Sequence, residues 1–173
     1  MVKLKIKLYS MKTRLLLSLI MLISAVTFAQ KSPSETAKGS VAEATIEITY
    51  SSPRVRDRVI FGNLVPYGKV WRAGANENTT ISFDKDVKVN GEVLTAGKYG
   101  FFIIPNEDGK WTAIFNKKND AWGSGSYNES EDALRLEVTA KDTKETVENL
   151  TYKVTKKGIR FAWADKAFML KVK

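Results

Sequence analysis

Short stretches of alternating apolar and polar residues, separated by turn residues, constrain the fold of this 173-residue chain more than any other feature. Between Thr45 and Tyr50 an apolar side chain occupies every second position, which is typical of a strand with one buried face. Asn90-Gly91 and Asp108-Gly109 indicate tight hairpins between such stretches, because these residue types adopt the positive φ angles that the turn needs. No stretch of the sequence has a convincing helical period.

The number and spacing of these stretches predict the fold class. About nine to ten short strands follow one another at spacings near ten residues. We therefore predict an all-β fold, a single antiparallel β-sandwich over residues 41–173, for which a jelly-roll-like connection is one arrangement. Residues 30–40 are small and polar, and we predict a flexible linker there.

Residues 1–29 have the composition of a secretory signal peptide. Five basic residues precede an uncharged apolar run from Leu15 to Phe28, and Ala29 is the small residue that a signal peptidase needs. The run is shorter than the roughly 20 residues of a transmembrane helix. We expect export to the periplasm or the extracellular space, with no transmembrane segment in the mature chain. The alternative is an uncleaved N-terminal anchor, and translation could start at Met11 as well as at Met1.

The net charge of +9 belongs in part to this N-terminal segment. Five of the 28 basic residues and none of the 19 acidic residues lie within it, so that 23 basic and 19 acidic residues remain. The remaining charges have interspersed signs, whereas a protein that binds nucleic acid concentrates its basic residues on one face. We therefore expect no nucleic-acid partner.

The absence of cysteine and histidine from the whole sequence excludes several kinds of chemistry. A chain without cysteine has no disulfides and no thiolate metal site. A chain without histidine has no Ser-His-Asp relay and no imidazole-ligated metal. We predict no cofactor and no metal, and any catalysis would have to use carboxylates, lysine, tyrosine or serine.

The stretch from Val65 to Thr80, V-P-Y-G-K-V-W-R-A-G-A-N-E-N-T-T, is the densest group of side chains suited to a binding site. The indole of Trp71 would pack against the C–H surface of a sugar. The polar groups of Arg72, Asn76 and Glu77 would bind hydroxyls or a carboxylate. The alternative is structural, with Arg72 and Glu77 paired to lock a long loop and Asn76 bonded to the backbone.

A second polar stretch, residues 116–132, is longer than a connection between strands needs to be. It carries two isolated aromatic residues, Trp122 and Tyr127. These side chains would either form a wall or lid over the site at Trp71 or close an open edge of the core.

We call the stretch from Val65 to Thr80 the central stretch and residues 116–132 the long loop. Both of them, together with residues before and between them, match a known family. The matching residues are Ser52-Pro53, Val55, Ile60-Phe61-Gly62, Val65-Pro66-Tyr67-Gly68, Val70-Trp71-Arg72, Gly74-Ala75-Asn76-Glu77, Thr79-Thr80, Ala96-Gly97, Tyr99, Phe115-Asn116-Lys117, Trp122-Gly123, Tyr127 and Asp132. In these residues the chain resembles the secreted bacterial domain-of-unknown-function family 2911. The resemblance implies an exported protein of unassigned biochemistry, and it identifies no catalytic residue.

These observations support three hypotheses about function. We favour a non-catalytic module with a shallow site for a glycan or another small polar ligand. Its ligand-binding residues would be Trp71, Arg72, Asn76, Glu77, Trp122 and Tyr127. The first alternative is a glycosidase-like hydrolase in which Glu77 acts with Asp120 or Asp132, which requires carboxyl groups roughly 5 to 9.5 Å apart. The second is an envelope interaction protein whose loops are purely structural.

Overall fold

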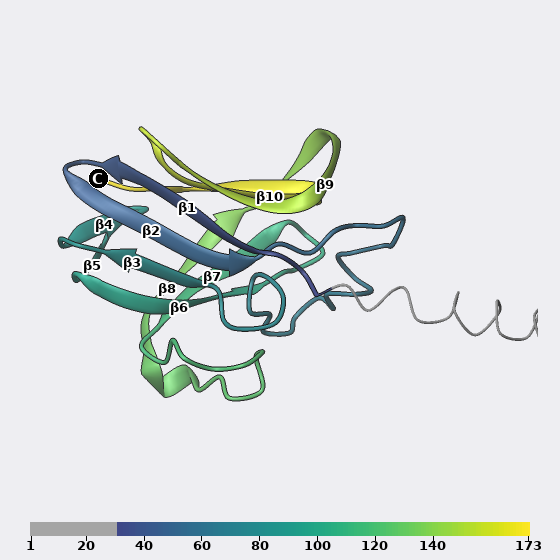
Figure 1. Cartoon of the computed structure of the whole chain (residues 1–173), viewed down its shortest axis with the longest axis horizontal. Coiled ribbons are helices and arrows are strands. Elements are labelled where there is room, and N and C mark those ends of the chain that lie inside the picture. Colours follow the sequence, from purple (N-terminus) through teal and green to yellow (C-terminus); the bar gives the residue numbers. More distant parts are fainter. Residues whose placement is uncertain (1–30) are drawn as a thin grey trace, which may run out of the picture. The chain divides into compact units, whose positions relative to one another are not determined.

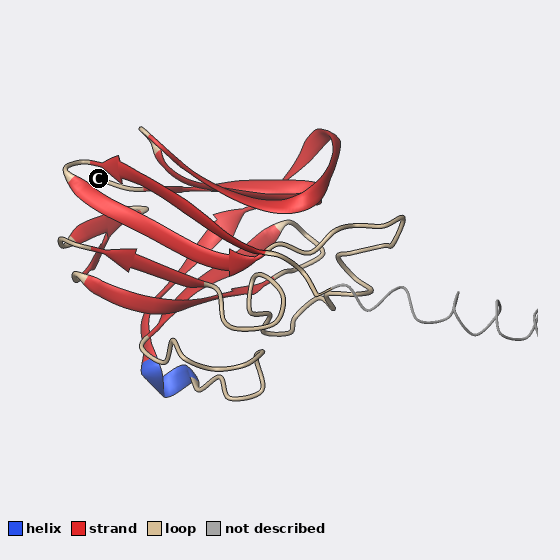
Figure 2. Ribbon diagram, in the orientation of Figure 1, coloured by secondary structure: helices blue, strands red, loops and turns tan. Residues whose placement is uncertain are grey.

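The computed structural model describes residues 31–173, which form ten strands and one short 3-10 helix (Figures 1 and 2). The predicted signal peptide, residues 1–29, lies outside the described residues. The elements are β1 (Ser34–Val41), β2 (Ala44–Ser51), β3 (Thr80–Phe83), β4 (Val87–Val89), β5 (Glu92–Leu94), β6 (Gly97–Ile104), β7 (Lys110–Asn116), η1 (Glu129–Glu131), β8 (Asp132–Thr139), β9 (Lys141–Thr155) and β10 (Gly158–Lys171).

Six strands form the larger sheet, in the order β1-β2-β3-β6-β7-β8, and every neighbouring pair is antiparallel. The register brings residues of the same face together. Ile48 of β2 lies opposite Ile81 of β3, and Ile81 lies opposite Tyr99 of β6. All three side chains are buried, as the alternating pattern predicts for the inner face of a sheet.

The second layer contains β9 and β10, which lie above the larger sheet in the view of Figure 1. The small β4-β5 sheet joins this layer through a bridge between Val89 and Val172, beyond the end of β10. Aromatic side chains fill the space between the layers: Tyr152 of β9 meets Tyr50 and Phe101 edge-on, with ring centroids 4.8 and 6.2 Å apart. The predicted all-β fold of antiparallel sheets is confirmed, and its two layers pack as in a sandwich.

Residues 34–40 are not the flexible linker that the sequence predicts, because they form most of β1. Ser34 to Val41 pair with β2 along their whole length. The chain turns between these strands at Ala42 and Glu43, with φ angles of 48° and 67°. Neither residue is typical of such a turn. β1 is also a largely exposed edge strand, so its small, polar composition resembles that of a linker.

β10 folds back on itself. Its 14 residues would span about 45 Å if they were straight. The N–H of Val172, the residue after the strand's last position, nevertheless donates a hydrogen bond to the carbonyl of Lys157, just before its first. The reversal lies near Ala164, which has a φ of 52° and separates two shifts of register. This close approach leaves no room for a side chain at Gly158.

Replacing Gly158 with alanine tests this arrangement. Gly158 has a φ of +130°, and an added Cβ would overlap the carbonyl oxygen of Leu170. We expect Gly158→Ala to lower the free energy of unfolding by about 3 to 5 kcal/mol in a urea denaturation experiment. Gly125→Ala is the matched control, because no described atom lies within 4 Å of its added Cβ. Equal stability of the two variants would contradict the fold-back.

Candidate functional site

Trp71 belongs to the core between the layers. Its backbone pairs with β6 beyond the end of β3, where it exchanges two hydrogen bonds with Ile103, 2.8 and 2.9 Å long. Its indole stacks on Trp163 with ring centroids 5.6 Å apart, and its Nε1–H donates to the Gly74 carbonyl at 3.0 Å. The structure therefore gives this indole a packing role, and we do not include it in the site proposed below.

Arg72 follows Trp71 on extended backbone, so its side chain leaves on the opposite side of the sheet. The residue is half-buried, and its Nε atom is buried without a hydrogen-bond partner. Burial lowers the pKa of the Arg72 guanidinium, and no carboxylate acts against this shift. Within residues 31–173, Arg72 therefore has no ion pair with Glu77. The Arg72–Glu77 part of the structural alternative is therefore not found among the described residues, whereas its other part, the backbone bond of Asn76, is present.

The central stretch and the long loop meet in a short antiparallel ladder. The N–H of Asn78 donates to the Ala121 carbonyl at 3.0 Å, and the N–H of Gly123 donates to the Asn76 carbonyl at 3.2 Å. Glu77 and Trp122 are the directly opposed pair between these two bonds. The side chains of such a pair lie close together on one face. Both are exposed, Trp122 to 65%.

Asn76 has a structural position at the start of this ladder. Its φ is 58°, a conformation that asparagine tolerates better than most residues. Its side-chain amide donates to the carbonyl of Ser32 at 3.2 Å. This bond connects the segment before β1 to the central stretch. The side chain of Asn76 therefore binds the backbone, as the structural alternative predicts.

Tyr127 anchors the other half of the long loop on the outer face of the larger sheet. Its hydroxyl donates to Asp132 Oδ2 and accepts from Arg135, both at 2.7 Å, and its ring meets Phe102 edge-on at 5.2 Å. Desolvation and the bond to Asp132 raise the pKa of Tyr127. Asn116 binds the other carboxylate oxygen of Asp132 at 2.7 Å. Tyr127 thus covers Phe102 and does not belong to the ladder.

Sequence reasoning did not include Asn78 in the site. The residue is 7% exposed, and neither its side-chain nitrogen nor its oxygen has a partner within the described part of the chain. Buried amides are normally hydrogen-bonded. Gly123 lies across the ladder and close to Arg72, whose terminal nitrogen would be 3.8 Å from a Cβ there. We call the group that this ladder assembles the loop site, and it consists of Arg72, Glu77, Asn78, Trp122 and Gly123.

The described residues show two further absences. No three or more acidic side chains within residues 31–173 are grouped so that they could hold a metal ion. No helix of that part of the chain is long and apolar enough to cross a membrane.

The fold and the loop site together define the class of this protein. It is an antiparallel all-β protein in which the two longest loop regions meet at the exposed Trp122. The chain belongs to the family described as "Protein of unknown function (DUF2911)", whose family model matches residues 32–172. This match confirms the family resemblance of the sequence. No curated protein and no solved structure matches the chain.

Removing the Tyr127 hydroxyl tests the anchoring of the long loop. Tyr127→Phe keeps the ring against Phe102 but removes two hydrogen bonds to charged partners. We expect the free energy of unfolding, measured by urea denaturation, to fall by about 1 to 3 kcal/mol. Tyr67→Phe is the control, because within residues 31–173 no hydrogen bond of the Tyr67 hydroxyl is found. A loss no larger than in this control would show that the network is unimportant.

Replacing the Arg72 guanidinium tests whether it stabilises the fold. Arg72→Met keeps an unbranched side chain and removes a half-buried charge without a counter-ion. We expect the thermal midpoint to stay unchanged or to rise by a few degrees, about 1 kcal/mol. The control Arg135→Met breaks the 2.8 Å pair with Asp132 and should lower the midpoint. A fall for Arg72→Met of roughly 6 to 20 °C would assign Arg72 to a structural pair.

Proposed function

We propose that this protein is an exported, non-catalytic module that binds a glycan or another small polar ligand at the loop site. Export is the part of the proposal supported by the N-terminal sequence, and binding is the part supported by the geometry. The observation that carries the proposal is the half-buried Arg72 guanidinium, which has no counter-ion among the described residues.

A cation in this position destabilises the protein unless something pairs with it. Complete removal of a charge from water costs several kcal/mol, and the half-buried Arg72 bears part of this cost, which an ion pair with good geometry offsets. Guanidinium groups bind carboxylates and phosphates with two parallel hydrogen bonds. A carboxylate or another oxyanion of a ligand would therefore supply the partner that the described residues do not provide for Arg72. Uncompensated strain of this kind is typical of functional sites.

Trp122 and Glu77 define the other features of the ligand. The remaining exposed large hydrophobic side chains of the described residues are aliphatic, and they are Val59, Leu64 and Val93. An exposed indole is suited to the apolar C–H face of a sugar ring or of a small zwitterion. The carboxylate of Glu77, opposite Trp122 in the ladder, would accept a hydrogen bond from a hydroxyl or an ammonium group. A polar ligand with an oxyanion and one apolar face fits this set.

The structure gives the hydrolase hypothesis no support from either suggested partner of Glu77. Both oxygens of Asp132 accept hydrogen bonds, from Asn116 and from Tyr127, and Arg135 pairs with the same carboxylate. The side chain of Asp120 is 82% exposed and lies 3.7 Å from Lys118. We therefore do not propose catalysis.

Calorimetric titration with neutral hexoses, N-acetylated amino sugars, uronic acids and free amino acids tests the proposal. We expect at least one acidic or zwitterionic compound to bind wild type, and binding to be lost in Trp122→Ala and in Arg72→Met. Val93→Ala, another exposed apolar residue, is the control and should bind as wild type does. Circular dichroism should show the same fold in all variants. Binding that survives both substitutions, or no binding by wild type, would refute the loop site.

A further inference from the structure

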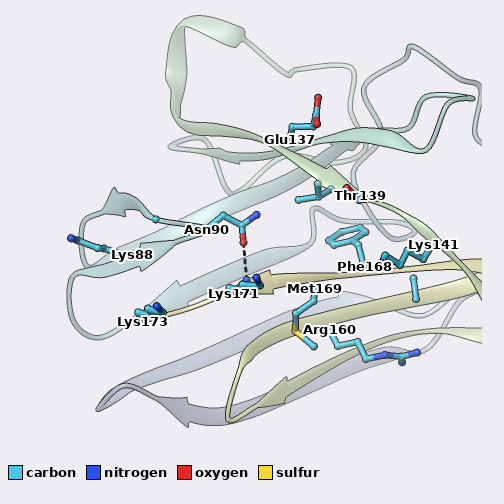
Figure 3. Close-up of a pocket in the computed structure, with 13 residues that line it drawn as sticks. Lys88, Asn90, Glu137, Thr139, Lys141, Arg160, Phe168, Met169, Lys171 and Lys173 are labelled. Atoms are coloured by element: carbon cyan, nitrogen blue, oxygen red, sulfur yellow. Dashed lines mark hydrogen bonds between the residues drawn. The ribbon is translucent and has the colours of Figure 1, made fainter.

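An open groove of about 730 Å³ lies between β4, β8, β9 and β10 (Figure 3). It shares no residue with the loop site. Most of its lining comes from regular strands and not from loops, and these strands belong both to the second layer and to β8 of the larger sheet.

The groove concentrates positive charge. Five basic residues and one acidic residue, Glu137, line it. The basic residues are Lys88, Lys141, Arg160, Lys171 and Lys173. Residues 31–173 contain 23 basic and 19 acidic residues, so 18 of each sign remain outside the groove. The entire net charge of the described chain is therefore located in this lining, and none of the five forms an ion pair there.

Backbone pairing holds three of these lysines on one face. Lys88 and Lys173 exchange two hydrogen bonds, 2.8 and 3.0 Å long, which makes them a directly opposed pair. Lys171 is two residues from Lys173, so its side chain points to the same side. Asn90 fixes this arrangement, since its side-chain oxygen accepts from the Lys171 N–H at 2.8 Å. Like charges in opposed positions destabilise a sheet, and a bound anion would relieve this repulsion.

The other two basic residues, Lys141 and Arg160, are separated from the three lysines by apolar residues of the lining. Figure 3 shows Lys88, Lys171 and Lys173 toward one end of the groove and Lys141 with Arg160 toward the other. The side chains between these two groups are those of Phe168 and Met169. A ligand that follows the groove must therefore carry separated negative groups with apolar surface between them.

We propose that this groove binds a linear acidic polysaccharide. Carboxylates that repeat along such a chain would reach the basic groups at both ends of the groove. The C–H faces of the pyranose rings would pack on Met169, and their hydroxyls would bind Glu137 and Thr139. Single-stranded nucleic acid is a poorer match because its bases stack on exposed aromatic rings. Phe168, the aromatic residue of this lining, is only 4% exposed.

Calorimetric titration of the full chain with oligogalacturonate tests this proposal. We expect the combined change Lys141→Gln, Arg160→Gln and Lys171→Gln to weaken binding by about tenfold or more, and binding to wild type to weaken as salt is added. The matched control is Lys69→Gln, Lys117→Gln and Lys156→Gln, which removes the same charge from exposed residues outside the groove lining. This control and Trp122→Ala should bind as wild type does.

Three further probes distinguish the occupant: a methyl-esterified oligogalacturonate, a poly-glutamate peptide of equal charge and a single-stranded oligodeoxynucleotide. The proposal requires oligogalacturonate to bind about tenfold tighter than each of them. Equal or tighter binding of the peptide or the oligonucleotide would overturn it in favour of another polyanion. Equal losses in the two triple variants, or no binding of oligogalacturonate to wild type, would overturn it as well.

Discussion

Tyr152 connects the packing of the two layers to the central stretch. Its ring is buried against Tyr50, Phe101 and Phe161, and its hydroxyl donates to the carbonyl of Ala73 at 2.7 Å. Burial raises the pKa of Tyr152 well above its ordinary value, which keeps this hydroxyl protonated as a donor. Ala73 is fully buried with a φ of 53°. The aromatic core thus holds the turn after Arg72, and the positions of Trp71 and Arg72 on opposite sides of the sheet depend on it.

Two ionisable groups on the outer face of the larger sheet differ in whether their charge has hydrogen-bond and ion-pair partners. The carboxylate of Asp132 accepts hydrogen bonds from Asn116, Tyr127 and Arg135, and this network anchors the long loop. The guanidinium of Arg72 has no such partner within residues 31–173. The contrast between them separates a structural cluster from a group that we interpret as a binding site.

The loop site and the basic groove are built in different ways. The loop site joins segments about 45 residues apart through two backbone hydrogen bonds between irregular stretches, around Asn76 and Gly123. The groove takes its cations from strands, and Lys88 and Lys173 are paired although they are 85 residues apart. A basic cluster of that origin leaves no run of charge in the sequence. The basic groove could therefore not be predicted from the sequence, in which positive and negative residues are interspersed.

The sequence by itself determined the class of the fold, because alternation and turn residues are local properties that each strand carries with it. It also indicated the family and the two stretches that form the loop site, since both depart from the strand pattern. Tertiary structure alone decided that residues 34–40 form a strand, because an exposed edge needs a partner and not a distinctive composition. It alone decided that Trp71 faces the core while Arg72 lacks a counter-ion. Alternation predicts which side chains of a regular strand face inward, but the partners that a side chain meets depend on contacts between segments far apart in the sequence.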